Sequence, residues 1–197
     1  MNHLRTFIAL ELPAAVREDL TRVQRRLMAR LATDAVRWTA IDSVHLTLKF
    51  LGDVPADRIP ALGEALQRAC QDTQELRLTL GALGSFPSLK KPSVIWLGVN
   101  GETMRLQQLY QAINAATQEF SEHAEDRTFQ PHLTLGRVKP NARSRARWLG
   151  GKLEAEAEAG ATDAKAEWTA DRVVLFKSDL TPKGSIYTPL VVAKFKS

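Results

Sequence analysis

A four-residue sequence with one histidine and one threonine occurs twice in the chain. His-Leu-Thr-Leu stands at residues 45–48 and again at residues 132–135. Near neutral pH, one protonated and one neutral imidazole can form a general acid and a general base. Such a pair suits displacement at phosphorus, because the base activates water and the acid protonates the departing oxygen, while hydroxyl groups donate to the remaining phosphate oxygens. The candidate catalytic residues are therefore His45 and His132, and the candidate phosphate-binding residues are Thr47 and Thr134.

Each copy has the alternation that is typical of a strand with one polar and one apolar face. The leucines are predicted to face a core, and the His and Thr side chains to face away from it. The same alternation places Lys49 on the face of His45, and Phe50 on the apolar face. Arg137 has the parity of the leucines, so it reaches the polar face only if the strand bulges or ends near Gly136. If the two copies face each other, their polar faces line a cleft.

Simpler explanations exist for each feature taken alone. A single histidine on a strand is usually a surface residue, and threonine favours strands because it is β-branched. The duplication in register favours the functional interpretation. A metal site is a weaker alternative, since two His with Thr in place of carboxylates form a poor ligand set and HExxH is absent. GxSxG, GxxxxGK[ST] and GxGxxG are also absent, which argues against an α/β-hydrolase, a P-loop NTPase and a Rossmann dehydrogenase.

Hydrophobic periodicity predicts an α+β fold. Alternating or β-branched segments predict strands at residues 4–12, 36–39, 45–52, 75–86, 93–99, 132–138, 172–177 and 187–195. Apolar residues at helical spacing predict helices at residues 14–31, from about 60 to 69, and at 106–120, with 141–160 helical in part. Each His-Leu-Thr-Leu strand follows a helix, so we expect one domain over residues 1–197 with two lobes. Each lobe would have an antiparallel sheet and outer helices, and a pseudo-two-fold axis would relate the two lobes around a central cleft.

Composition and charge narrow the class of protein. The 197 residues are 44% hydrophobic with a net charge of +5, which is enough chain for a core without disulfides. No apolar run approaches the ~18 residues needed to span a bilayer, no secretory segment is seen, and Cys70 is the only cysteine, so we expect a cytoplasmic protein. From Arg127 to Leu153 there are seven basic residues and no acid. These bases form either a phosphate-contacting surface or a solvated helix face balanced by the glutamates within residues 154–158.

Several segments together resemble the two-histidine phosphoesterases. The segments that resemble the bacterial and archaeal branch are residues 5–10 with Pro13, 45–52, 94–98, 129–137, and 175–178 with 187–190. This branch comprises the RNA 2′,3′-cyclic phosphodiesterases, also called 2′-5′ RNA ligases. The resemblance implies a bilobal α+β fold with antiparallel sheets around a V-shaped cleft and no required metal or other cofactor.

The resemblance also implies roles for individual residues. His45 matches the histidine that donates a proton to the leaving group, and His132 matches the general base on water. Thr47 and Thr134 match the phosphate-binding threonines. Arg137 matches an arginine that follows the second motif. Phe7 and Tyr187 are further candidates for substrate binding, Phe7 by base stacking, with core packing as the alternative for both.

The sequence and the resemblance together predict a metal-independent hydrolase. It would open an RNA or nucleoside 2′,3′-cyclic phosphate to a 2′-phosphate, together with reversible 2′-5′ ligation of RNA. The expected partners are RNA with cyclic phosphate ends or cyclic nucleotides, bound by a monomer away from any membrane. The alternative is an RNA- or nucleotide-binding module with vestigial catalysis. Residues 141–168 depart most from the family pattern.

Overall fold

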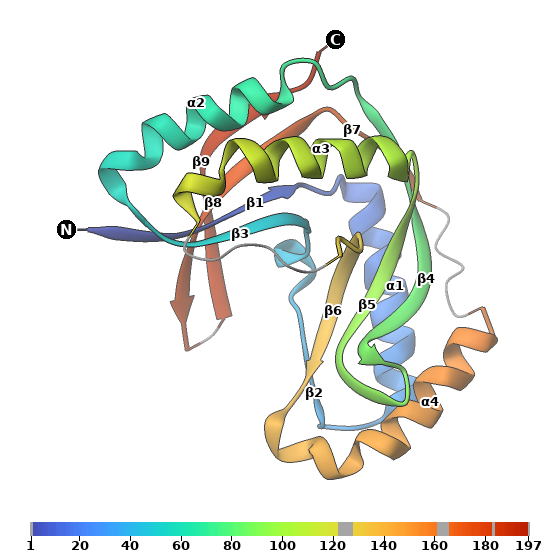
Figure 1. The fold of residues 1–197 in the computed structure, drawn as a ribbon. Coiled ribbons are helices and arrows are strands. Elements are labelled where there is room, and N and C mark those ends of the chain that lie inside the picture. Colours follow the sequence, from blue (N-terminus) through green and yellow to red (C-terminus); the bar gives the residue numbers. More distant parts are fainter. Residues whose placement is uncertain (1, 122–127, 161–165, 183, 197) are drawn as a thin grey trace.

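The computed structural model describes residues 2–121, 128–160, 166–182 and 184–196, without the side chains of residues 143–146. Its helices are α1 (Ala14–Leu31), α2 (Ile59–Cys70), α3 (Thr103–Ala116) and α4 (Ala146–Glu158) (Figure 1). Its strands are β1 (His3–Leu10), β2 (Val36–Trp38), β3 (Leu46–Pro55), β4 (Leu76–Ser88), β5 (Lys91–Gly101), β6 (His132–Val138), β7 (Glu167–Ala170), β8 (Arg172–Thr181) and β9 (Gly184–Lys194). No helix among these residues is long and apolar enough to cross a membrane.

The strands form a nine-stranded sheet in the order β7-β4-β5-β6-β3-β1-β8-β9, with β2 paired to β6. The named strands pair antiparallel throughout. Strands β3 and β6 meet at one residue pair, Leu46 and Leu133. This contact divides the sheet into the halves β7-β4-β5-β6 and β3-β1-β8-β9, and β2 lies beside β6 of the first half. These leucines occupy the same position in the two copies of the repeat, so a local two-fold axis passes between them. The predicted α+β fold with antiparallel strands is confirmed, and the two predicted sheets are the two halves of one continuous sheet.

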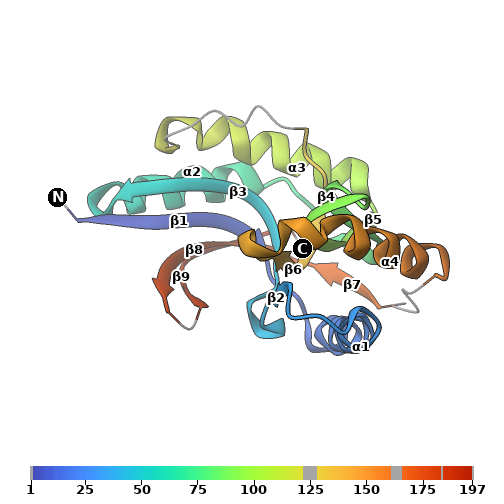
Figure 2. The ribbon, with the colours of Figure 1, turned by 90° about the horizontal axis from the view of Figure 1, so that it is seen from below.

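Different helices cover the two halves. Helices α2 and α3 pack on the half that contains β3, β8 and β9, whereas α4 packs on β4 and β5 and contacts α1 (Figures 1 and 2). Helix α1 also holds β6, because the Gln24 side-chain amide donates to the Leu135 carbonyl. The apolar residues that predicted α1 are buried along one of its faces: Val16, Leu20, Val23, Leu27 and Leu31. Burying such an apolar stripe is the main source of stability for a helix of this kind.

Candidate active site

The two His-Leu-Thr-Leu copies place their polar side chains on the face of the sheet that the core leaves open. All four leucines of the copies are at most 3% exposed. His45, Thr47, His132 and Thr134 are half-buried. The strands that carry them meet at the pseudo-two-fold axis, and the positive charge of His132 acts on His45. The structure therefore brings together the four residues that the repeat singled out.

The two imidazoles are oriented in the same way. Nδ1 of His45 lies 2.9 Å from the carbonyl oxygen of Ser43, and Nδ1 of His132 lies 2.7 Å from that of Gln130. A carbonyl oxygen only accepts hydrogen bonds, so Nδ1 carries the hydrogen in both rings. Nε2 is then the atom of each ring that can accept or donate a proton in a reaction.

Burial lowers the pKa of both imidazoles and so favours their neutral forms. Burial lowers the pKa of His45 from 6.5 to about 4; the hydrogen bond to Ser43 opposes this shift and the charge of His132 adds to it. The pKa of His132 is also lowered by burial, against the hydrogen bond to Gln130 and with the help of the Arg137 charge. An anion bound between the rings favours their charged forms. The site is thus suited to take up a proton together with a phosphate.

The predicted alternation fails after Thr47, because β3 bulges there. Thr47 pairs with Ala9 of β1 while Lys49 pairs with the adjacent Ile8, so β3 has one extra residue at this point. The bulge reverses the two faces. Lys49 is only 2% exposed and its Nζ donates to the Asn114 carbonyl of α3, 3.0 Å away. The predicted placement of Lys49 beside His45 is therefore wrong.

Phe50 is the residue that the bulge turns onto the histidine face. It is 60% exposed, and its ring centroid lies 6.1 Å from that of Phe7. The sequence analysis placed Phe50 on the apolar face and so missed it as an exposed aromatic side chain near His45.

The equivalent bulge in β6 determines the position of Arg137. Thr134 pairs with Trp96 of β5, and Gly136 pairs with the adjacent Ile95, so Leu135 is the extra residue. Ile95 is buried in the core, which places Gly136 on the core face and Arg137 on the histidine face. The effect of the Arg137 charge on His132 agrees with this placement. The condition that the strand bulges near Gly136 is met, and Arg137 and Phe50 occupy equivalent positions of the two copies.

Aromatic rings support His45. Phe7 stacks on it with ring centroids 4.7 Å apart, and Tyr187 contacts it edge-on at 5.2 Å. Phe7 also stacks on Phe176 and is only 3% exposed. Its ring has almost no free face for a base, so the predicted base stacking on Phe7 is not supported, and the packing alternative describes what it does. Tyr187, half-buried at the rim of this cluster, keeps part of its surface open.

A second aromatic pair supports His132. Phe86 contacts its ring edge-on at 4.9 Å and Trp96 lies 5.9 Å away. Trp96 in turn packs against Gly84 of β4, where a Cβ atom would lie 2.2 Å from the indole ring. Neither ring was among the predicted site residues, although Trp96 lies in a segment that carries the family resemblance.

We expect Gly84→Ala to destabilise the fold by about 1–3 kcal/mol, because the added methyl group must displace a packed ring. It should also lower kcat, since Trp96 contacts His132. Gly151→Ala is the matched control, because this glycine lies in α4 with no atom within 4 Å of an added Cβ. There the change should stabilise by about 0.5–1 kcal/mol. Equal unfolding free energies for the two variants in urea would contradict the packing argument.

The basic stretch after β6 is described only in part. The side chains of Arg143 and Arg145 lie outside the described residues, and Arg147 is exposed. Glu156, one of the acids that could have balanced this stretch, instead pairs with Arg26 and Arg30 of α1. Contact between this stretch and phosphate stays a prediction.

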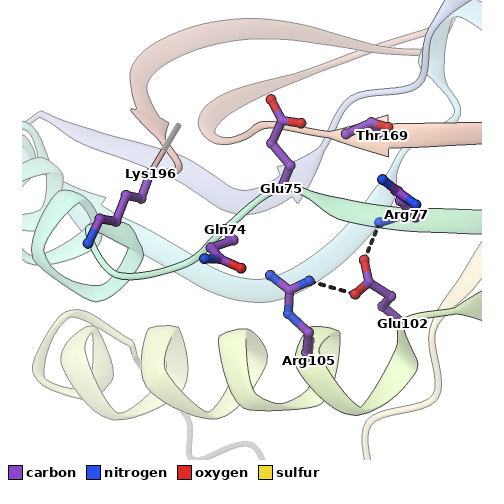
Figure 3. Close-up of a pocket in the computed structure, with 7 residues that line it drawn as sticks. All are labelled: Gln74, Glu75, Arg77, Glu102, Arg105, Thr169 and Lys196. Atoms are coloured by element: carbon purple, nitrogen blue, oxygen red, sulfur yellow. Dashed lines mark hydrogen bonds and ion pairs between the residues drawn. The ribbon is translucent and has the colours of Figure 1, made fainter.

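A polar hollow of about 520 Å³ lies away from the histidines (Figure 3). It is lined by residues at the starts of β4 and α3, by β7 and by the C-terminal end of the described chain. Within it Glu102 accepts a hydrogen bond from the Arg77 backbone and pairs with Arg105 at 2.6 Å, which ties α3 to β4. Both interactions lower the pKa of Glu102. No predicted site residue lines the hollow, and among the described residues no group of three or more His, Cys, Asp or Glu could hold a metal.

The fold and the duplicated motif agree with the comparison to protein families. The family model of the 2′-5′ RNA ligase superfamily matches residues 12–182, and the chain belongs to this superfamily.

Particular relatives cover almost the whole chain. The RNA 2′,3′-cyclic phosphodiesterase of Thermotoga maritima is 32% identical over 195 residues, which span 98% of this chain and 96% of the relative. The protein of the same name from Methanothermobacter thermautotrophicus is 30% identical and spans 96% and 97%. The structure of Escherichia coli LigT in its apo form covers 100% of both chains at 26% identity with a TM-score of 0.74. LigT complexed with 3′-AMP gives the same coverage, identity and TM-score.

Proposed function

We propose that this protein is an RNA 2′,3′-cyclic phosphodiesterase that opens the cyclic phosphate to a 2′-phosphate. The observation that carries the proposal is the symmetric pair His45 and His132, whose Nδ1 atoms are both tied to backbone carbonyls. Curated relatives that span nearly the whole chain carry the name of this activity, and a solved relative binds 3′-AMP. The acid–base mechanism and its regiochemistry are part of the proposal.

The reaction needs one proton removed and one delivered. Nε2 of His132 accepts a proton from water, and the water oxygen forms a new bond to phosphorus. The bond from phosphorus to the ribose 3′ oxygen breaks, and Nε2–H of His45 donates its proton to that oxygen. The product keeps the phosphate on the 2′ oxygen. Assigning the acid to His45 and the base to His132 follows the family resemblance, and the near-symmetry of the two rings permits it.

Other side chains on this face would bind the substrate. Thr47 and Thr134 lie on the same face as the histidines, where their hydroxyls can donate to non-bridging phosphate oxygens. Arg137 adds a permanent positive charge beside His132. Phe50 and Tyr187 offer aromatic surface on the His45 side, which suits stacking of a base.

The proposed mechanism uses no metal. It rests on the donor set around the histidines, where threonines and aromatic rings stand in place of carboxylates, a poor environment for zinc or magnesium. The driving force is the strain of the cyclic ester. The same ring opening with an RNA 5′-hydroxyl in place of water would form a 2′-5′ linkage without ATP.

The test is hydrolysis of adenosine 2′,3′-cyclic phosphate after prolonged treatment with EDTA. We expect full activity, with adenosine 2′-phosphate as the product identified by chromatography against the 3′-isomer. Formation of the 3′-phosphate would overturn the regiochemistry. Loss of activity that Zn²⁺ or Mn²⁺ restores would overturn the metal-independent mechanism, and no hydrolysis of any cyclic phosphate would overturn the proposed function.

A further inference from the structure

Two arginines stand opposite each other on neighbouring strands beside the candidate active site. Arg37 of β2 and Arg137 of β6 are direct partners in an antiparallel pair. Side chains of directly paired residues lie on the same face of a sheet, and like charges in this arrangement destabilise the pairing. The pair therefore calls for an explanation.

The shared face is the histidine face. On the opposite side of these strands, Val36 and Trp38 crowd Gly136, where a Cβ would lie 2.8 Å from a Val36 methyl carbon. Val36 is buried in the core at 5% exposure, so Arg37, which alternates with it, points away from the core. The bulge in β6 has already placed Arg137 on this side.

The two charges are open to solvent. Both side chains are exposed, and no carboxylate forms an ion pair with either guanidinium within the part of the chain that the structure describes. Neighbouring strands are about 5 Å apart, so both guanidinium groups can contact one phosphate. Such an anion would turn an unfavourable pair of like charges into a binding site.

We propose that Arg37, together with Arg137, binds the 5′-phosphate of the nucleotide that carries the cyclic phosphate. This inference rests on the proposed function. It identifies RNA ends, rather than free cyclic nucleosides, as the preferred substrate class. In an RNA chain this 5′-phosphate is the phosphodiester to the preceding nucleotide, whereas a nucleoside 2′,3′-cyclic phosphate lacks it. Arg137 lies next to His132, so its replacement would also affect the reacting site. Arg37 lies one strand farther out, so replacing Arg37 tests binding of the 5′-phosphate alone.

A structural alternative is that Arg37 only protects the edge of the short strand β2. Charged residues commonly serve this purpose on edge strands, because they discourage pairing with other chains. In that case Arg37 has no effect on which substrate is preferred.

The smallest test compares adenosine 2′,3′-cyclic phosphate with the same molecule carrying a 5′-phosphate. We expect the wild-type kcat/KM to be roughly ten-fold higher for the 5′-phosphorylated substrate, the value of about one charge-assisted hydrogen bond. Arg37→Ala should remove most of this preference and lower kcat/KM much less for the substrate without the 5′-phosphate. Arg37→Lys should keep part of the preference, because lysine retains the charge without the planar fork. The preference should also shrink as salt is added.

Arg25→Ala is the matched control, since Arg25 is an exposed arginine on α1. It removes the same charge from a helix, not from the histidine face, and should leave the preference intact. An equal preference in wild type and Arg37→Ala, or an equal loss in Arg25→Ala, overturns the inference while hydrolysis itself still supports the proposed function. Failure of the wild type on both substrates refutes the proposed function instead.

Discussion

Replacing either histidine by alanine should lower kcat for adenosine 2′,3′-cyclic phosphate by roughly 10²–10⁴-fold, the usual effect of losing a general acid or base. The two rings have equivalent hydrogen bonds and partly exposed positions, so neither is expected to substitute for the other. His45→Ala with His132→Ala should lose less than the product of the single effects, because the two groups act as one unit. Single-turnover kinetics with saturating enzyme measures the chemical step directly.

An activated substrate separates the acid from the base. A p-nitrophenyl phosphodiester has a leaving group that departs without a proton, so it bypasses the general acid. We expect His45→Ala to recover much of its lost activity on this substrate, and His132→Ala to stay impaired. The opposite pattern would exchange the two roles and overturn the assignment taken from the family resemblance.

His3→Ala is the control for both variants, because His3 lies on the exposed start of β1 and carries no predicted role. Near-wild-type turnover in a folded His45→Ala or His132→Ala protein would rule out the two-histidine mechanism. Unfolding curves for each variant exclude loss of structure as the cause, since removing an imidazole that contacts Phe7 or Phe86 also removes packing.

The alternation of residues correctly predicted which side chains face the core and which face away from it, as far as each threonine. A period of two is a local property, and it holds wherever neighbouring strands pair in register. The extra residues at Leu48 and Leu135 depend on the strands beside them, so alternation alone does not reveal them. Gly136 is a signal for the second bulge, since glycine within a strand often marks one. The first copy has Lys49 at that place and carries no such signal.

The aromatic supports of the histidines depend on the order of strands. Phe7, Phe176 and Tyr187 meet because β1 pairs with β8 and β8 with β9. The face of the strand that each side chain occupies could be predicted from its own strand. Their contact with His45 depends on the order of strands in the sheet, which is a property of the tertiary structure. The position of Arg37 also depends on the sheet order, because this residue of the short strand β2 lies opposite Arg137 only through the pairing of β2 with β6.

The stability of the protein should depend on pH through His45. Because burial lowers its pKa from 6.5 to about 4, the unfolded chain binds more protons than the folded one between these values. The contribution of His45 to the free energy of unfolding is therefore complete above pH 6.5, is lost as the pH falls towards 4, and does not change further below pH 4. At 1.36 kcal/mol per pKa unit the loss amounts to about 3 kcal/mol. His132, whose pKa is also lowered, acts in the same direction.

The measurement is urea unfolding of the wild type and of His45→Asn at several values between pH 4 and pH 7. Carboxylates contribute to acid destabilisation in both proteins, so the difference between their curves isolates His45. We expect this difference to move by about 3 kcal/mol in favour of the asparagine variant as the pH falls. Bound phosphate should reduce the change, because an anion beside the ring raises the pKa of His45. Parallel curves would mean that the imidazole is not desolvated in the folded protein, and the coupling of proton uptake to phosphate binding would fail with it.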